Sequence, residues 1–294
     1  MSLQTVRDKS LSTRLDLLYH DYNHADATSD PVHRVRPFAD PADREIVGFC
    51  AAGLAFGRVA SVLNSIDALL AVTGSRPAAF VRTFEPEAAT PAMRAIVHRW
   101  IRGADLIALL WILRQMIDRS GSIEGFFLEG YDPSAADIGP ALDSFSTRAL
   151  ALDLRRAYGR TPRRPGVCYF FPRPSAGSAC KRLNLFLRWM IRADEVDLGV
   201  WTRVSASQLI VPLDTHVIRL GRCLGLTRYA SPGWKMAADI TAALRRLDRA
   251  DPVRFDFSLC HVGMMQACGY GRKQGDSQCP LKGLCRPRGG RARR

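Results

Sequence analysis

Two short strings in the C-terminal half of the chain hold the side chains best suited to chemistry. Gly177-Ser-Ala-Cys-Lys-Arg-Leu-Asn184 places Lys181 where a turn of small residues meets an apolar segment. A helix beginning there would lower the pKa of this lysine and make its amine a nucleophile. Pro212-Leu-Asp-Thr-His-Val-Ile-Arg219 places Asp214 at a helix N-cap, where backbone N–H groups would keep its carboxylate ionised. Taken singly, these residues are better explained as an exposed lysine and a capping aspartate.

Helices must position these residues, and helical patterning runs along most of the chain. Asp40-Pro-Ala-Asp43 is typical of a helix start, because proline suits the first turn and acids suit its positive end. The helix of Lys181 is apolar nearly all round, so we expect it to be buried. Prolines enclose Val167–Phe171, which favours an extended loop over a strand. The fold class is therefore all-α. The predicted helices cover 11–22, 40–55, 59–72, 91–102, 105–120, 181–192, 214–224, 236–247 and 255–268.

Together the two strings resemble motifs of the helix-hairpin-helix DNA glycosylases, of which endonuclease III is a familiar member. Gly177, Lys181 and Asn184 fall on the Gly, Lys and Asn of that family's hairpin. The chain is also similar to a group of bacterial proteins that share Cys-Lys-Arg-Leu-Asn-Leu-Phe-Leu-Arg-Trp-Met and Pro-Leu-Asp-Thr-His, although this similarity names no substrate. The residues on the family's second motif are Asp214, Thr215, His216 and Arg219.

The resemblance implies a role for each matching residue. Lys181 would attack the sugar carbon as a Schiff-base nucleophile, and Asp214 would stabilise positive charge on the sugar. Backbone amides of the hairpin would bind a DNA phosphate. Phe56 and Arg58 stand where the family has a glutamine that fills the gap left by an extruded base. The residues expected to contact DNA are Gly177, Ser178, Asn184, Arg58, Arg219, Arg272 and Lys273.

The resemblance also implies a two-lobed fold. One lobe would cover residues 40–192 and end in the hairpin. The other would combine residues 1–39 with 200–285 and carry a Cys-rich loop, followed by a disordered basic tail at 286–294.

The sequence departs from the family pattern in two places. Ala179 replaces the second glycine of the hairpin, and the insert Asp194–Trp201 lengthens the stretch between the two motifs. The insert is either structural or a part of the base pocket. The aromatic residues that could stack on a base are Tyr169, Phe170, Trp189 and Trp201.

Cysteines concentrate near the C-terminus. The resemblance implies a four-iron, four-sulfur cluster, which normally takes four thiolates. Cys268, Cys279 and Cys285 match its spacing, and the fourth ligand would be Cys260, two helical turns before Cys268, or Asp276. Zinc is an alternative, as are three unligated cysteines.

Charge points to a polyanion partner. The net charge is +14, and half of it lies beyond residue 270, where eight basic residues face one acid. Nucleic acid is the expected partner, with double-stranded DNA first. The sequence shows neither a secretory signal nor an apolar run of transmembrane length, which predicts a cytoplasmic, nucleoid-associated bacterial protein without a membrane partner.

The resulting hypothesis is a DNA glycosylase, with or without abasic-site lyase activity, that removes a damaged or modified base. Two alternatives stay open. The scaffold could bind nucleic acid without catalysis, with Asp214 as a cap only. The same fold could instead act on RNA or on modified foreign DNA.

Overall fold

The regular structure consists almost entirely of helices, so the expectation of an all-α fold is confirmed. The computed structural model describes residues 3–25, 30–160, 163, 165–265 and 279–285. The α-helices are α1 (Leu3–Tyr22), α2 (Pro41–Leu54), α3 (Val59–Thr73), α4 (Pro77–Thr83), α5 (Pro91–Ala95), α6 (Gly103–Ser120), α7 (Ile123–Leu128), α8 (Gly139–Leu150), α9 (Arg155–Tyr158), α10 (Lys181–Ile191), α11 (Thr215–Cys223), α12 (Trp234–Arg245) and α13 (Asp256–Met264). Short 3-10 helices cover Pro31–Arg34, Pro86–Ala88, Gly166–Phe170 and Ala206–Gln208.

Helix starts follow the capping signals in the sequence. Asp40 caps α2 by accepting a hydrogen bond from the backbone N–H of Ala42 at 2.9 Å, and Pro41 occupies the first turn. Asp214 caps α11 in the same way. The predicted burial of α10 is confirmed, since its residues from Leu183 to Ile191 are all buried.

The helix predicted over 91–102 is wrong in its second half. Helix α5 ends at Ala95, and the chain then forms a two-stranded antiparallel hairpin of β1 (Val97–His98) and β2 (Ile101–Arg102). The hairpin returns the chain onto the end of α5 so tightly that a Cβ atom on Gly103 would overlap the Arg94 carbonyl oxygen. Strands of two residues are too short to show a period of two in the sequence.

The segment Val167–Phe171 also differs from the expected extended loop. It lies largely within the 3-10 helix Gly166–Phe170, and Val167 and Phe170 are buried. The turn that precedes α10 therefore follows a 3-10 helix.

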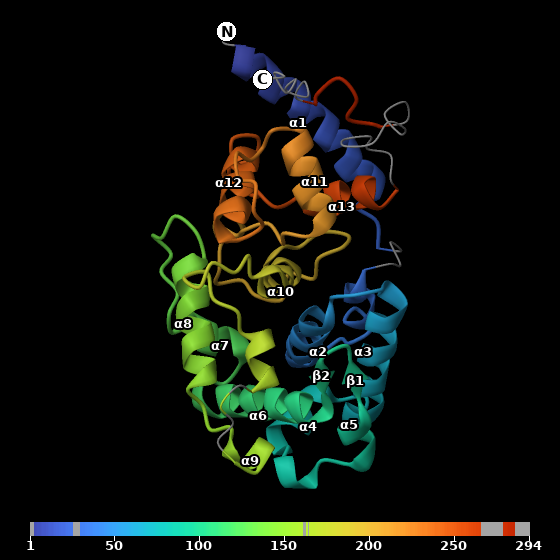
Figure 1. Ribbon diagram of the computed structural model, residues 1–294, viewed down its shortest axis with the longest axis vertical. Helices are drawn as coiled ribbons and strands as arrows, with labels where there is room; N and C mark the ends of the chain where they lie inside the picture. The colour runs from blue at the N-terminus through green and yellow to red at the C-terminus, as the bar shows by residue number, and fades with distance from the viewer. Residues whose placement is uncertain (1–2, 26–29, 161–162, 164, 266–278, 286–294) are drawn as a thin grey trace, which may run out of the picture.

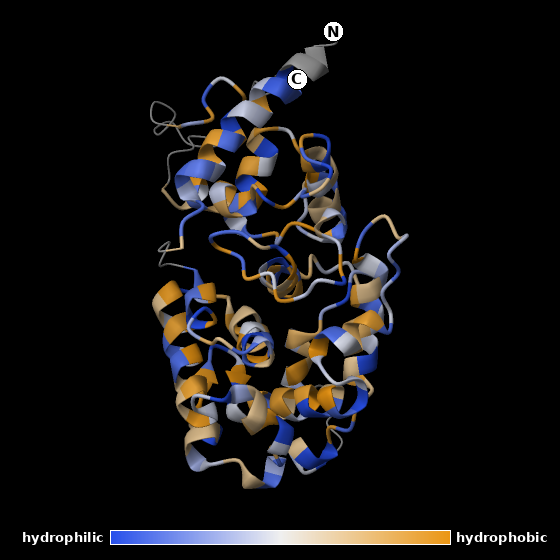
Figure 2. Ribbon diagram, turned by 180° about the vertical axis from the view of Figure 1, so that it is seen from behind, coloured by the Kyte–Doolittle hydropathy of each residue, from blue (hydrophilic) through white to orange (hydrophobic). Residues whose placement is uncertain are grey.

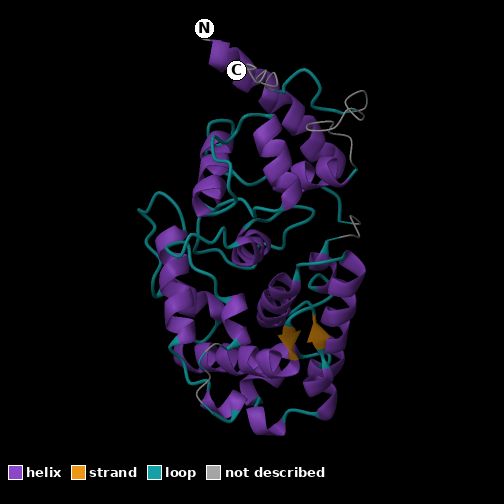
Figure 3. Cartoon of the chain, viewed as in Figure 1, coloured by secondary structure: helices purple, strands orange, loops and turns teal. Residues whose placement is uncertain are grey.

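The helices gather in two groups with α10 between them (Figures 1 and 3). Helices α1, α11, α12 and α13 form one group, and α2 to α9 form the other. Apolar stretches occur on helices of both groups (Figure 2), and the buried apolar side chains form one continuous core. The lobe boundaries at 40–192 and 200–285 stay a prediction, and the tail 286–294 lies outside the described residues.

None of the described helices combines the length and apolar character needed to cross a membrane.

Candidate active site

A cavity of about 650 Å³ lies where both sequence motifs come together. We call it the Lys181 cavity. Its walls come from Asp30 and Pro31, the loop after α2, the first turns of α3 and α11, and one face each of α10 and α13. These elements surround the middle of the molecule in Figure 1. Its polar lining residues are Asp30, Lys181, Arg188, Asp214, Thr215, His216, Asp256, Cys260 and His261.

Asp214 is fixed in the cavity wall by its capping role. Its Oδ1 accepts hydrogen bonds from the backbone N–H groups of His216 at 2.8 Å and Val217 at 2.7 Å. Its Oδ2 accepts a hydrogen bond from the thiol of Cys260 at 3.1 Å. One carboxylate oxygen therefore holds the helix, while the other is engaged by a thiol, a weak donor.

Lys181 is the first residue of α10, directly after a strained turn. Cys180, at the N-cap, has a φ of 48°, in the left-handed region that non-glycine residues seldom adopt. Gly177 begins the turn with a φ of 81°. Lys181 lines the cavity and forms no hydrogen bond or ion pair with any described residue. Its amine is therefore not committed to a structural contact within this part of the chain.

The neighbours of Lys181 in residues 177–184 mainly stabilise the turn before α10. Ser178 accepts a hydrogen bond from the Cys180 N–H at 3.2 Å. Asn184 is 1% exposed and donates to the Ala179 carbonyl at 3.0 Å, so its amide supports the turn from inside the protein. Gly177 is exposed, its N–H donates to the Pro174 carbonyl at 2.8 Å, and its own carbonyl accepts from the Trp234 N–H at 3.2 Å. Of the three residues expected at a phosphate, Gly177 and Ser178 are accessible and Asn184 is not.

A buried charge network forms the floor of the cavity. The Arg188 guanidinium is 2.6 Å from Asp256 Oδ2, 3.1 Å from Asp197 and 3.4 Å from Asp30. Arg188 thus has three carboxylates around it and cannot balance their negative charge alone. Asp197 is also paired with Arg192. Buried ion pairs of this kind hold a geometry more than they add stability.

Asp256 is the carboxylate of that network that keeps an oxygen without a hydrogen-bond partner among the described residues. Its side chain lines the cavity, the residue is 3% exposed, and its Oδ1 has no hydrogen-bond partner among the described residues. Burial, with a smaller contribution from Asp214, raises the pKa of Asp256 to about 7. A buried oxygen without a partner is costly in a folded protein and is a position where a bound molecule could supply the missing hydrogen bond.

The aromatic groups at the cavity differ from those expected. Phe170, Trp189 and Trp201 are buried elsewhere in the core, and no residue of the insert Asp194–Trp201 lines the cavity. The cavity takes its aromatic lining from four residues on other elements. They are Phe56, Phe257, His216 and His261.

His261 joins the aromatic wall of α13. Its ring lies 4.2 Å from that of Phe257, and burial lowers its pKa, which favours the neutral imidazole. Its Nδ1 lies 3.1 Å from the Phe257 carbonyl oxygen. The sequence of α13 did not predict that Phe257 and His261 line a cavity, because this depends on how α13 packs against α11.

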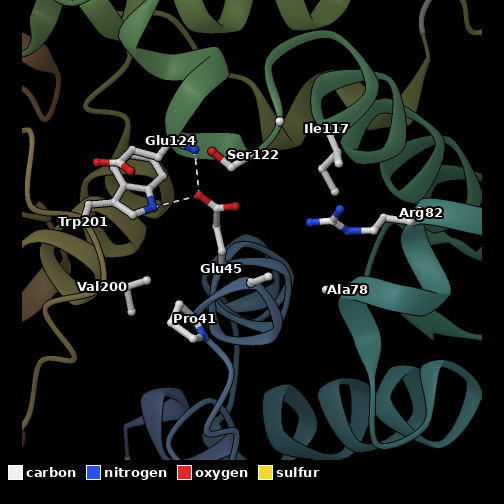
Figure 4. A pocket seen from close by; sticks show the side chains of 11 residues that line it. Pro41, Glu45, Ala78, Arg82, Ile117, Ser122, Glu124, Val200 and Trp201 are labelled. Atoms are coloured by element: carbon white, nitrogen blue, oxygen red, sulfur yellow. Dashed lines mark hydrogen bonds between the residues drawn. The ribbon is translucent and has the colours of Figure 1, made fainter.

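The insert serves a different, smaller cavity of about 160 Å³. We call it the Glu45 cavity, since the Glu45 carboxylate lies at its centre (Figure 4). Glu45 Oε1 accepts from Trp201 Nε1 at 2.8 Å and from the Glu124 N–H at 2.6 Å, and Oε2 accepts from the Ile123 N–H at 2.9 Å. Burial raises the pKa of Glu45. Glu45 thus joins α2 to the start of α7, and Trp201 attaches the insert to the same carboxylate, so the insert is structural here.

The cysteines are arranged differently from the expected ligand set. Cys260 bonds Asp214 in the cavity wall, and burial beside Asp214 raises its pKa, which keeps it a thiol. Cys223, at the end of α11, lies with its sulfur 3.0 Å from that of Cys285. Cys279 is buried, and both Cys268 and Asp276 lie outside the described residues. Cys223 was missed because its partner lies far away in sequence.

Two of the described cysteines lie close enough together to be compared with the expected ligand set. Cys223 and Cys285 fit as two neighbouring thiolate ligands, but no group of three metal-binding side chains occurs in the described portion of the chain. Arg7 holds this region in place by donating to the carbonyls of Leu224 at 2.6 Å and Leu284 at 3.3 Å.

The arginines predicted to contact DNA fall into three classes. Arg58 is exposed at the N-cap of α3, beside the cavity-lining Gly57 and Val59. Arg219 donates to the Gly263 carbonyl and so joins α11 to α13. Arg272 lies outside the described residues, as does Lys273.

Comparison with known proteins adds a family and no activity. No curated protein and no solved structure matches the chain. Residues 30–265 match the family model described as "Protein of unknown function (DUF2400)", and the chain belongs to that family.

Proposed function

We propose that the chain is a DNA glycosylase that acts through Lys181 and Asp214. One observation carries the proposal: residues from two separate motifs, a lysine without a structural partner and a fixed aspartate, line the same cavity. Its volume of about 650 Å³ falls in the range of roughly 300–1,000 Å³ typical of small-molecule sites. The space admits a base rotated out of a duplex, which this chemistry requires.

The reaction follows from the positions of the two side chains. The Lys181 nitrogen attacks C1′ of the extruded nucleotide through its lone pair, and the glycosidic bond breaks. The bonding electron pair leaves with the base, which takes up a proton. Asp214, held by two N–H groups, stabilises positive charge as it develops on the sugar. The C1′–O4′ bond then breaks, O4′ takes up a proton as the nitrogen loses one, and the open-chain sugar is joined to Lys181 as a Schiff base. Water hydrolyses this Schiff base, or loss of a C2′ proton with departure of the 3′ phosphate cleaves the strand by β-elimination.

The floor of the cavity would contact the base. Asp256 Oδ1 can accept a hydrogen bond from a ring N–H or an amino group, and the rings of Phe257 and Phe56 offer apolar surface for stacking. Asp30 adds a second carboxylate to the same lining. These carboxylate oxygens accept hydrogen bonds and therefore favour bases that present N–H groups.

Phosphate binding is assigned to the turn before α10. Ser178 is bonded to the Cys180 N–H, while the N–H groups of Lys181 and Arg182 have no acceptor among the described residues. The first turn of a helix with free N–H groups is a good phosphate site. The net charge of +14 supports a polyanionic partner.

The proposal includes an iron–sulfur cluster near the C-terminus, with Cys285 and Cys223 as two of its ligands. The cluster would brace the C-terminal segment against α11. Zinc held by the same thiolates is the alternative.

A non-catalytic DNA-binding scaffold is the second candidate function. It is favoured by the fact that the Asp214 cap bonds alone justify an aspartate at that position.

Release of free base distinguishes the two functions. The purified chain is incubated with duplexes that carry damaged or modified bases, and liberated bases are identified by mass spectrometry. The proposal predicts release from at least one duplex, loss of release in Lys181→Ala, and full release in Lys9→Ala, which removes an exposed lysine of α1. Salt-dependent binding of the whole panel without release of any base would support the non-catalytic scaffold.

A further inference from the structure

Three aromatic side chains form a continuous surface beside the Lys181 cavity, and we call them the aromatic ladder: Phe56, Trp100 and Tyr169. The rings of Phe56 and Trp100 are stacked with centroids 4.7 Å apart, and those of Trp100 and Tyr169 lie 5.7 Å apart. Phe56 also lines the cavity. Trp100 is 49% exposed and Tyr169 is 50% exposed, so the outer two rungs present large apolar faces to solvent.

Trp100 is held rigidly at the tip of the β1–β2 hairpin. His98 is 2% exposed, and its ring nitrogens lie 2.9 Å from the Phe56 carbonyl oxygen and 2.9 Å from Ser65 Oγ. These contacts tie the hairpin to the loop after α2 and to α3. Its turn includes Arg99, whose φ of 54° is unusual for a residue with a side chain. Backbone strain of this kind is often retained where function requires it.

The ladder is surrounded by arginines. The Arg182 guanidinium lies 5.1 Å from the centre of the Phe56 ring, and that of Arg99 lies 5.7 Å from Trp100. Arg58 and Arg102 are exposed on the flanking segments. Among the described residues none of these four arginines forms an ion pair. Arg182 donates to the carbonyls of Gly53 and Tyr169, and Arg102 donates to that of Arg99. The exposed Arg58 and Arg99 are therefore the two most accessible to an anionic partner. Exposed aromatic faces among unpaired arginines match the pattern of surfaces that stack bases and hold phosphates.

We propose that the aromatic ladder is the surface on which duplex DNA stacks next to the extruded nucleotide. This inference rests on the proposed function, because it needs a base in the Lys181 cavity. Trp100 stacks on the base pair that flanks the vacated position, Tyr169 extends the stack, and Arg58 and Arg99 contact the adjacent phosphates. Phe56, which belongs to both the ladder and the cavity, lies where the extruded base separates from the helix.

The ladder thus replaces the expected gap-filling pair Phe56 and Arg58 with a larger surface. A hairpin held by a buried histidine can press against a base stack without first becoming ordered. Aromatic side chains that stack on bases each contribute strongly to binding and tolerate different sequences. The chemistry of the ladder therefore sets the position of the DNA, while the cavity floor discriminates between bases.

The test uses the full chain and a duplex containing a tetrahydrofuran abasic analogue with 2-aminopurine beside it. Binding is measured by anisotropy and stacking by 2-aminopurine fluorescence. Trp100→Ala is expected to weaken binding roughly tenfold or more and to abolish the fluorescence change. Trp100→Phe should keep most of both signals. Leu17→Ala removes an equally exposed apolar side chain from α1 and should change neither.

The outcomes separate this inference from the proposed function. Wild-type and folded Trp100→Ala proteins with equal affinity and equal fluorescence change would overturn the stacking role and leave the glycosylase proposal intact. A wild-type protein that binds no duplex would overturn both. A Trp100-dependent fluorescence change seen only with single-stranded RNA would overturn the assignment to duplex DNA. If Trp100→Ala does not fold, Tyr169→Ala takes its place, and unchanged affinity and fluorescence in that variant would overturn the stacking role.

Discussion

The Lys181 cavity and the Glu45 cavity each contain a buried carboxyl group whose pKa is raised by burial, but they treat that group differently. Glu45 is satisfied by three donors from α7 and the insert. Asp256 keeps one oxygen without a partner, in a space about four times larger. Burial of an acid therefore does not by itself mark a functional site. An unsatisfied group facing a space large enough for a ligand is the more informative observation.

Asp214→Asn tests the catalytic side of this comparison with the largest expected effect. Asparagine caps a helix as well as aspartate does, so the free energy of unfolding should change by less than about 1 kcal/mol. The negative charge beside the sugar is lost, and base release should fall by about 10²–10³-fold. Denaturant unfolding and single-turnover base release measure the two effects. Unchanged base release would reduce Asp214 to a helix cap.

Glu45→Ala tests the structural side. Three donors lose their acceptor, so the free energy of unfolding should fall by about 3 kcal/mol. Base release per folded molecule should stay unchanged, because Glu45 does not line the Lys181 cavity. Glu87→Ala, at a side chain 58% exposed, is the matched control and should be nearly neutral. A folded Glu45→Ala protein without activity would show that the two cavities are not independent.

Because of Asp256, the free energy of unfolding should depend on pH. Burial raises its pKa in the folded protein to about 7, above the usual value of about 4 in an unfolded chain. The folded state therefore binds an extra proton between these values, and the stability linked to Asp256 is full below pH about 4 and lost as the pH rises to about 7. Unfolding measured across this window should show a slope of up to about 1.4 kcal/mol per pH unit that Asp256→Asn removes. Parallel curves for the two proteins would mean that Asp256 does not titrate there.

The cysteines provide the smallest test, since it concerns support of the fold. Cys223→Ser should lower the iron bound per chain, because the Cys223 sulfur lies beside Cys285. Cys260→Ser should leave the iron content unchanged, since this thiol bonds Asp214. Metal analysis of anaerobically purified protein measures both. The reverse pattern would restore Cys260 as the ligand.

Local signals in the sequence predicted much of the fold. The caps at Asp40 and Asp214 and the buried character of α10 each depend on a few neighbouring residues, and each is confirmed. The hairpin 97–102 was missed because its two-residue strands are fixed by the packing of Gly103 against α5. Local patterns carry little information about contacts of that kind.

The candidate site was predictable in part for the same reason. Lys181 and Asp214 stood out through their motifs. The pairing of Arg188 with Asp256 joins distant segments, and only an arginine within an apolar helix hinted at it. None of the four aromatic residues expected at the base lines the cavity. The sequence does not distinguish a buried tryptophan such as Trp189 from an exposed one such as Trp100.

Borohydride trapping on abasic and damaged duplexes tests the central claim most directly. Reduction of a Schiff base would join protein and DNA covalently, and digestion followed by mass spectrometry would locate the modified lysine. The account predicts an adduct on Lys181 that is absent in Lys181→Ala and unchanged in Lys9→Ala. Base release without an adduct on Lys181, or an adduct on another lysine, would contradict it.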